Sequence, residues 1–492
     1  MVTFSARDQL MTKIRAIKGR VISLRDAPNR TTTAAVMRHS DTSALQAAID
    51  RAIVEKRNVY FPAGRYRLTK GLSVRDAAAI RIEGAGGETT VLDISDGEGA
   101  CFELDYGTEV TIRNFRMVGH TGRDQEPADF STSSGHRFWA SALKRCQAVT
   151  ICGTERVLIE NVHASKMSAE CFYSQGPGRE GAKVPKAYTK EITYRGCSVT
   201  DCAANAFNNN DLAENTSVLQ CRIENVARDG WHAWEGPSRF IRLVGNYIRN
   251  AGPFTIGDES HRPEHLYELG CGQAIVSDNV FEGIGRSEGV LVESGPRQVV
   301  VSDNLFVNYT GPAIRVSGET DHDPYSSAFP TRNVTVTGNI IDMLRDPENQ
   351  RYRTGIRVGG ASDVIVSNNQ IYVRGNNDPH VVGVIIDEPS INVDVNDNLI
   401  ENCGYGIWAR RASSTVTQVL DARTFLESQL PLEWRTSHLY RDWKAIWVAD
   451  GKVAGVSTIE SFDPTSFQFR LKEPRDLRVG DRFEIAPPGG AN

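Results

Sequence analysis

The sequence predicts an all-β fold: a parallel solenoid of short strands, closed by an N-terminal helix and followed by a small C-terminal β-rich module. Three observations across the 492 residues support this prediction. A unit of a few short strands recurs with its parts in the same order. Apolar and polar residues alternate with period two inside each unit, which is the strand pattern. One amphipathic segment precedes the first unit. A unit of this size must stack on its neighbours to bury its apolar side.

The first element in chain order is a lead-in over residues 1–39, where Leu10, Ile14 and Ile17 suggest a short helix. We expect a second helix over residues 41–56, because its apolar residues share one helical face. These residues are Leu45, Ala48, Ile49, Ala52 and Ile53, and Asp41 and Thr42 can cap the helix start. Such a helix would close the end of the solenoid and hide its core and open strand edges.

The solenoid is predicted over residues 40–411. Its unit reads VLIENVHASKMSAECFY from Val157, AIVSDNVFEGIGRSEGVLVE from Ala274 and VDVNDNLIENCGYGIWA from Val393. Each unit has an Asn or Cys at its bend, 24 to 35 residues after the last one: Cys197, Cys221, Asn246, Asn279, Asn304, Asn339, Asn369 and Asn398. Asn tolerates the left-handed conformation and bonds its own backbone. Stacked at one corner, these side chains could also form a ladder.

Long excursions leave the repeat at His120, Gly257, Gly318, Arg345 and Arg374. Excursions from a solenoid lie on its surface, and loops on one side build a groove that often serves binding. After Arg411 the repeat ends. Residues 412–492 read as a separate β-rich module with several aromatic residues.

The repeat and the segment SDTSALQAAIDRAIVEKRNVYFPAGRYRL from Ser40 together resemble the right-handed parallel β-helix proteins of the pectate-lyase-like superfamily. The resemblance covers Asp41 to Arg411. In that superfamily a helix closes the β-helix, and a strand with Phe-Pro-Ala-Gly-x-Tyr starts the first coil. The resemblance implies a right-handed, single-stranded parallel β-helix and a protein that acts on carbohydrate, as phage tailspike depolymerases do. The Asp cluster of calcium-dependent pectate lyases is not evident in this sequence. The Asn-Thr-Asp, Asp-Asp and Gly-His-Gly set of galacturonases is absent.

Composition limits the partners. A net charge of −5 excludes a strongly basic nucleic-acid binder. The sequence has no run of eighteen apolar residues for a membrane span and no apolar signal-peptide core at its start. The nine cysteines form no CxxC pair, so we expect reduced packing residues. Polysaccharide-acting enzymes normally leave the cell, whereas a virion part needs no export signal. We therefore expect an extracellular or virion-associated protein, and the resemblance to tailspikes implies a C-terminal module that could form a homotrimer.

The strand register points to one outer face as the candidate site. If Val290 and Val292 face the core, Leu291 and Glu293 face solvent. The same register puts six more residues outside: His232, Trp234, Arg315, Arg357, Asp387 and Trp408. Coils stack about 4.8 Å apart, so residues of neighbouring coils can share one patch. The catalytic candidates are Asp229, His232, Glu235, Asp258, Glu259 and Glu293. The substrate-binding candidates are Asn209, Asp211, Arg228, Trp234, Arg315 and Arg357.

Three functions remain open. Two of the carboxylates could hydrolyse a glycosidic bond, with their separation deciding retention or inversion. Alternatively, His232 could act as the base of a uronate lyase while an arginine holds the carboxylate. The third function is a non-catalytic glycan-binding adhesin or structural spike. No metal site is assigned. Calcium in the loop of Asp321, His322 and Asp323 is possible in principle, and Pro263 spoils a zinc pair of His261 and His265.

Overall fold

The structure of the protein is a computed structural model. It describes residues 21–23, 42–120, 145–176, 189–210, 213–234, 239–257, 273–283, 288–293, 295–318, 331–345, 353–375, 377–387, 390–410, 412–427, 441–449, 452–463 and 466–486. The chain divides into two units, which we describe one at a time. The first is Met1–His232 with Ser238–Ala251, and the second is Ala233–Pro237 with Gly252–Asn492.

The first unit contains the predicted helix, α2 (Thr42–Val54), packed against β2 (Asn58–Phe61) and β4 (Lys70–Arg75). Ala48, Ile49 and Ala52 are buried on the predicted apolar face. The Gln46 amide donates to the Ser73 carbonyl and accepts from the Ser73 N–H, both at 2.8 Å. The helix therefore covers the first coil with apolar contacts and satisfies backbone groups of β4, which confirms the predicted N-terminal cap. The lead-in helix predicted around Leu10 lies outside the described residues.

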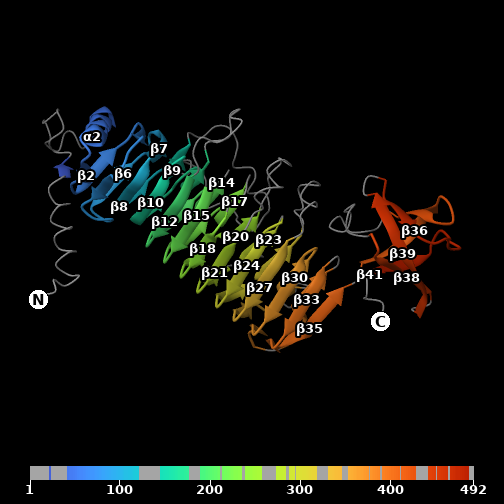
Figure 1. Ribbon diagram of the computed structural model, residues 1–492. Helices are drawn as coiled ribbons and strands as arrows, with labels where there is room; N and C mark the ends of the chain where they lie inside the picture. The colour runs from blue at the N-terminus through green and yellow to red at the C-terminus, as the bar shows by residue number, and fades with distance from the viewer. Residues whose placement is uncertain are drawn as a thin grey trace, which may run out of the picture. The chain divides into compact units, whose positions relative to one another are not determined.

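The strands of the first unit pair in parallel with the strand of the next coil, so that they lie side by side (Figure 1). One sheet contains β1 (Val21–Ser23), β2, β5 (Arg81–Gly84), β8 (Thr108–Val118), β10 (Glu155–Ser165), β12 (Thr189–Arg195), β15 (Ala213–Leu219) and β18 (Ile241–Val244). After a bend in the chain, the same sheet continues with β3 (Gly64–Arg67), β6 (Thr90–Asp93), β13 (Ser198–Cys202), β16 (Arg222–Val226) and β19 (Tyr247–Arg249). The other sheet follows β4, β7 (Glu98–Asp105), β9 (Cys146–Cys152), β11 (Phe172–Gln175), β14 (Phe207–Asn210) and β17 (Asp229–Trp234).

The second unit repeats this arrangement. Its first sheet holds β21 (Ala274–Ser277), β24 (Arg297–Ser302), β27 (Arg332–Thr337), β30 (Ser362–Ser367) and β33 (Ile391–Asn396), continued by β22 (Val280–Glu282), β25 (Leu305–Tyr309), β28 (Ile340–Met343), β31 (Gln370–Val373) and β34 (Leu399–Glu401). Its other sheet holds β20 (Gly252–Gly257), β23 (Val290–Glu293), β26 (Ile314–Ser317), β29 (Arg353–Gly359), β32 (Asp378–Asp387) and β35 (Cys403–Arg410).

The predicted C-terminal module is a closed antiparallel barrel of six strands. These are β36 (Ala412–Val419), β37 (Thr424–Glu427), β38 (Lys444–Ala449), β39 (Lys452–Asp463), β40 (Gln468–Leu471) and β41 (Arg482–Ala486). Its core gathers the aromatic residues noted in the sequence, among them Phe425, Trp447, Phe469 and Phe483. The barrel has its own apolar core, as the sequence indicated.

The predicted asparagine ladder exists, and it runs inside the coil. In the second unit Asn279, Asn304, Asn339 and Asn369 are at most 1% exposed. The backbone N–H of each donates to the Oδ1 of the ladder residue one coil later, at about 3 Å: Asn279 to Asn304, Asn304 to Asn339, Asn339 to Asn369, and Asn369 to Asn398. The ladder asparagines do not take the left-handed conformation themselves. The preceding residue does: Asp278, Asp303, Gly338, Asn368 and Asp397 have φ between 51° and 68°.

In the first unit, cysteine replaces asparagine at two rungs of the ladder. Cys197 and Cys221 are buried and free, and the Cys221 N–H donates to Asn246 Oδ1 at 2.8 Å. Burial raises the pKa of the Cys221 thiol well above its usual range, and the neighbouring Cys197 raises it further. A thiol with such a pKa is not a nucleophile at neutral pH, so Cys221 is a packing residue, as predicted.

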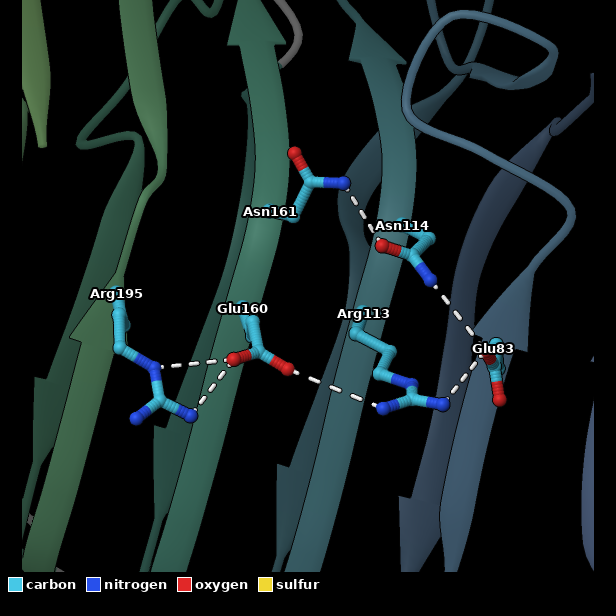
Figure 2. A network of polar contacts seen from close by, with 6 residues as sticks. All are labelled: Glu83, Arg113, Asn114, Glu160, Asn161 and Arg195. Carbon is cyan, nitrogen blue, oxygen red and sulfur yellow. Dashed lines mark hydrogen bonds and ion pairs between the residues drawn. The ribbon is translucent and has the colours of Figure 1, made fainter.

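A second ladder crosses the outer face of the first unit (Figure 2). Arg113 on β8 donates to Glu83 on β5 at 2.7 Å and lies 3.9 Å from Glu160 on β10. Glu160 also accepts two hydrogen bonds from Arg195 on β12, at 2.6 and 3.0 Å. Charge alternates along four successive coils, so every in-register neighbour attracts and a one-coil slip would bring like charges together.

Glu160→Gln should lower the free energy of unfolding by only about 0.5–1 kcal/mol, because the pairs are partly exposed and screened by solvent. Urea titration at low and high salt measures this, and the difference should shrink at high salt. Glu88→Gln is a matched control, since Glu88 is 79% exposed and lies 3.8 Å from Arg116. An effect of several kcal/mol, or one that persists in high salt, would contradict this view of the ladder.

Candidate functional site

The candidate site lies on the outer face of the second sheet of the first unit, at β17. Trp231 points inward and is 1% exposed, so the alternate residue His232 points outward, as the sequence predicted. The exposure is lower than predicted, since only 7% of His232 is accessible. The imidazole is therefore a nearly covered group on the outside of the coil.

His232 forms a dyad with Asp229. Its Nδ1 lies 2.5 Å from Asp229 Oδ2. The backbone of Asp229 is fixed from the previous coil, because its N–H donates to Asn205 Oδ1 at 3.1 Å and its carbonyl accepts from the Ala206 N–H at 2.9 Å. With Nδ1–H donated to the carboxylate, Nε2 carries the lone pair. A carboxylate that orients an imidazole in this way prepares it to accept a proton.

Three further residues near the dyad, Tyr173, Gln175 and Glu170, were not predicted from the sequence. The Tyr173 hydroxyl on β11 donates to Gln175 Oε1 at 3.0 Å, and Tyr173 pairs in register with Asn208 on β14. Both Tyr173 and Gln175 alternate with the inward residues Phe172 and Ser174. The register that located His232 would have located them too, had it been applied to the strand FYSQ.

Glu170 is the other residue that sequence reasoning missed. The Cys171 N–H donates to the Asn205 carbonyl, and the Ala206 N–H donates to the Asp229 carbonyl. These bonds place Glu170, Asn205 and Asp229 at one level of three successive coils. Two coil spacings put the backbones of Glu170 and Asp229 about 10 Å apart. Glu170 is 6% exposed. This backbone separation is slightly larger than the roughly 6.5–9.5 Å between the carboxyl groups of inverting glycosidases.

Asn209 does not reach this surface. It is fully buried inside the coil, where its Nδ2 donates to Thr216 Oγ1 at 2.9 Å. Its amide Oδ1 accepts from Ser174 Oγ. The prediction that Asn209 binds substrate on the outer face is wrong. Side chains alternate along β14, so Asn208 faces outward and Asn209 faces inward.

The remaining candidates of this region are only partly described. Arg228 precedes β17 and is half-buried. Trp234 ends β17, and its side chain lies outside the described part of the chain. Asp211, Glu235, Asp258 and Glu259 lie outside the described residues, as do the loops with Asp321 and with His261 and His265. Among the described residues no three His, Cys, Asp or Glu side chains are grouped to hold a metal ion.

In the second unit, the predicted register holds for Arg315 and Arg357, which are in-register neighbours on β26 and β29. Arg315 Nη1 lies 3.6 Å from Glu288 Oε1, and Arg357 Nε lies 2.6 Å from Asp387 Oδ2. Both arginines therefore have carboxylate partners on the solenoid face. Asp387 was predicted to be outside, yet it is 3% exposed, packed against the Arg357 side chain. Glu293 is half-buried at the end of β23.

Comparison with known proteins supports the fold. Residues 37–232 match the family model "Rhamnogalacturonase A/epimerase, pectate lyase-like", and residues 264–420 match "Right handed beta helix region". No curated protein sequence matches the chain. In the described part of the chain no helix is long and apolar enough to cross a membrane.

Similar solved structures include the Dettilon tailspike protein, at 12% identity and a TM-score of 0.52, covering 98% of this chain and 96% of that one. The catalytic domain of a GH87 alpha-1,3-glucanase in complex with nigerose has 12% identity and a TM-score of 0.52, with 79% and 68% covered. The A-module of an Azotobacter vinelandii mannuronan C-5 epimerase has 16% identity and a TM-score of 0.50, with 79% and 99% covered. Together with the family models, these matches confirm the resemblance to right-handed parallel β-helix proteins of the pectate-lyase-like superfamily.

Proposed function

We propose that the protein binds a polysaccharide on the outer face of the second sheet and cleaves it by elimination at a uronate residue. The observation that carries this proposal is the Asp229–His232 dyad, with Nδ1 and Oδ2 2.5 Å apart. Elimination begins when a base removes the proton beside the uronate carboxyl group. His232 Nε2 takes that proton, and the electrons of the C–H bond form a C=C bond as the C–O bond to the leaving sugar breaks. Water protonates the leaving oxygen, and an unsaturated sugar remains.

The surroundings of the dyad suit a sugar ring. Asn208 and Tyr173 are in-register neighbours on the coils before β17, and they offer an amide and a phenol to sugar hydroxyls. His232 is only 7% exposed, and a base shielded from bulk water interacts more strongly with charge in the transition state. The similarity to proteins whose names include an epimerase, a glucanase and a tailspike is consistent with a carbohydrate ligand.

Hydrolysis is the second candidate, and one specific observation favours it. The backbones of Glu170 and Asp229 are two coils apart, a separation of about 10 Å that would allow their carboxyl groups to approach the spacing of an inverting pair. Asp229 is already engaged with His232, which favours its role as the orienting partner of a base. For this reason we place elimination first.

The products decide between these functions. The protein would be incubated with alginate, polygalacturonate, dextran and galactomannan, and the products followed by ultraviolet absorbance and by a reducing-end assay. Elimination gives new reducing ends together with the absorbance of an unsaturated uronate. Hydrolysis gives reducing ends without that absorbance. Binding without any product would overturn both and favour a glycan-binding adhesin or structural spike.

Three finer points belong to the same proposal. We infer an extracellular or virion-associated protein, as the tailspike resemblance implies. We also propose that the C-terminal barrel supports a homotrimer, which sedimentation of the intact chain would test. The other predicted site residues remain to be tested by mutagenesis. The catalytic candidates are Glu235, Asp258, Glu259 and Glu293, and the binding candidates are Asp211, Arg228, Trp234, Arg315 and Arg357.

A further inference from the structure

Tyr106 and Phe240 are large aromatic residues of the first unit in a backbone conformation that suits glycine. The φ of Tyr106 is +54°, and the residue is 47% exposed. A bulky residue at positive φ costs stability, and burial does little to offset that cost here, since about half of the residue faces solvent. Tyr106 is singled out by the two charged groups beside its ring, Arg75 and Asp105.

The neighbouring coils show what this corner otherwise holds. The Asp76 N–H donates to the Asp105 carbonyl, and the Tyr106 N–H donates to the Cys152 carbonyl, both at 2.9 Å. Asp76, Tyr106 and Gly153 therefore occupy the same corner of three successive coils. Their φ values are 54°, 54° and 58°. The coil accepts Asp or Gly here, residues that adopt this conformation at low cost, so the fold does not require a tyrosine.

Two charged groups beside the ring complete a binding surface. The Arg75 guanidinium lies 5.9 Å from the centre of the Tyr106 ring and 3.6 Å from the Asp105 carboxylate. Arg75 is 63% exposed, and Asp105 is 28% exposed. Partial burial raises the pKa of Asp105, while Arg75 opposes that shift. An aromatic surface flanked by a donor and an acceptor is suited to a sugar ring, which has an apolar face and a rim of hydroxyls.

We propose that Tyr106, Arg75 and Asp105 form a second saccharide-binding site, separate from the dyad and selective for an uncharged sugar residue. The selectivity follows from charge: Asp76 and Asp105 together outnumber Arg75, so an anionic sugar is repelled. β7 and β17 are four strands apart, which separates this site from the dyad by about 19 Å. The site holds a polysaccharide without taking part in its cleavage.

Affinity electrophoresis of the full chain in native gels tests this proposal, with dextran and galactomannan as neutral probes and alginate as the anionic one. We expect at least one neutral polymer to retard the wild-type protein. Tyr106→Gly should raise the dissociation constant for that polymer about threefold to tenfold, the loss expected when one aromatic contact is removed. Its melting temperature should stay equal or rise, because glycine relieves the strained backbone.

Phe240→Gly is the matched control. Phe240 has a φ of +55° and is also 47% exposed, on another coil of the same unit. The same backbone change there should leave the retardation unchanged. His232→Ala should also leave it unchanged, which separates failure of this site from failure of the proposed catalytic function. The proposal is overturned if neither neutral polymer retards the wild type, if both glycine variants weaken binding equally, or if Tyr106→Gly is clearly less stable.

Discussion

His232→Ala is expected to slow polysaccharide cleavage by about 10²- to 10⁴-fold, the contribution typical of a positioned general base. The substitution removes the group that accepts the proton. Initial rates of product formation at saturating substrate measure the effect. Affinity for the polysaccharide should change little, because the imidazole acts on the reacting proton and its loss lowers mainly the maximal rate.

Asp229→Asn tests the orienting role of the carboxylate. The amide can still lie against Nδ1 at the observed 2.5 Å, but it no longer fixes the proton on that nitrogen or stabilises the imidazolium that forms. We expect a large loss of the maximal rate with nearly normal binding. In the hydrolytic alternative Glu170→Gln would abolish activity instead, and His232→Ala would be tolerated.

His163→Ala serves as the control for loss of an imidazole. His163 lies on β10 in the other sheet of the same unit, and its Nδ1 is 2.9 Å from Ser198 Oγ. This variant removes a half-buried, hydrogen-bonded histidine without touching the dyad, so it should keep its activity. Equal losses in the His163 and His232 variants would show that the effect is structural, and the dyad would then have no catalytic role.

The direction of His232 could be predicted from sequence because Trp231 and Ala233 flank it in a strand whose apolar residues mark the inside. Asn209 was misplaced because its polar side chain indicated the outside, although the buried Phe207 two residues earlier marks its inward phase. Ser174 and Thr216 create a polar position inside the coil. Its partners come from other strands, and such contacts are not visible in the local pattern.

Other features depend on which residues of successive coils lie side by side. The sequence repeat defines this alignment only to within a residue or two. The position of Glu170 at the same level as Asp229, two coils away, depends on the observed alignment through Asn205. The strain at Tyr106 comes from its positive φ, and the presence of a tyrosine in a turn does not indicate that angle. The Asn ladder was predicted because its spacing is regular, yet the left-handed residue proved to be the one before each asparagine. The side chain bridges coils from inside, and the preceding residue makes the bend.

Asn339→Ala should lower the free energy of unfolding by about 3–5 kcal/mol, far more than a typical surface substitution. Asn339 is fully buried, and its Nδ2 donates to the Val301 carbonyl and to Asn369 Oδ1, both at 2.9 Å. Its Oδ1 accepts from the backbone N–H and the Nδ2 of Asn304, at 3.1 and 2.9 Å. Alanine would leave several of these groups buried without partners, each costing about 1–3 kcal/mol.

Urea unfolding followed by circular dichroism measures this loss, with Asn396→Ala as the matched control. Asn396 is an exposed residue of β33 in the same unit, and its Nδ2 donates to Asp394 Oδ2 at 2.8 Å in solvent. Its removal should cost less than about 0.5 kcal/mol. Similar losses in both variants would mean that the ladder contributes no more than a surface pair. A large difference would show that the interior amides hold successive coils in register. Only the loss of the buried Asn339 amide leaves hydrogen-bonding groups of both the preceding and the following coil without partners.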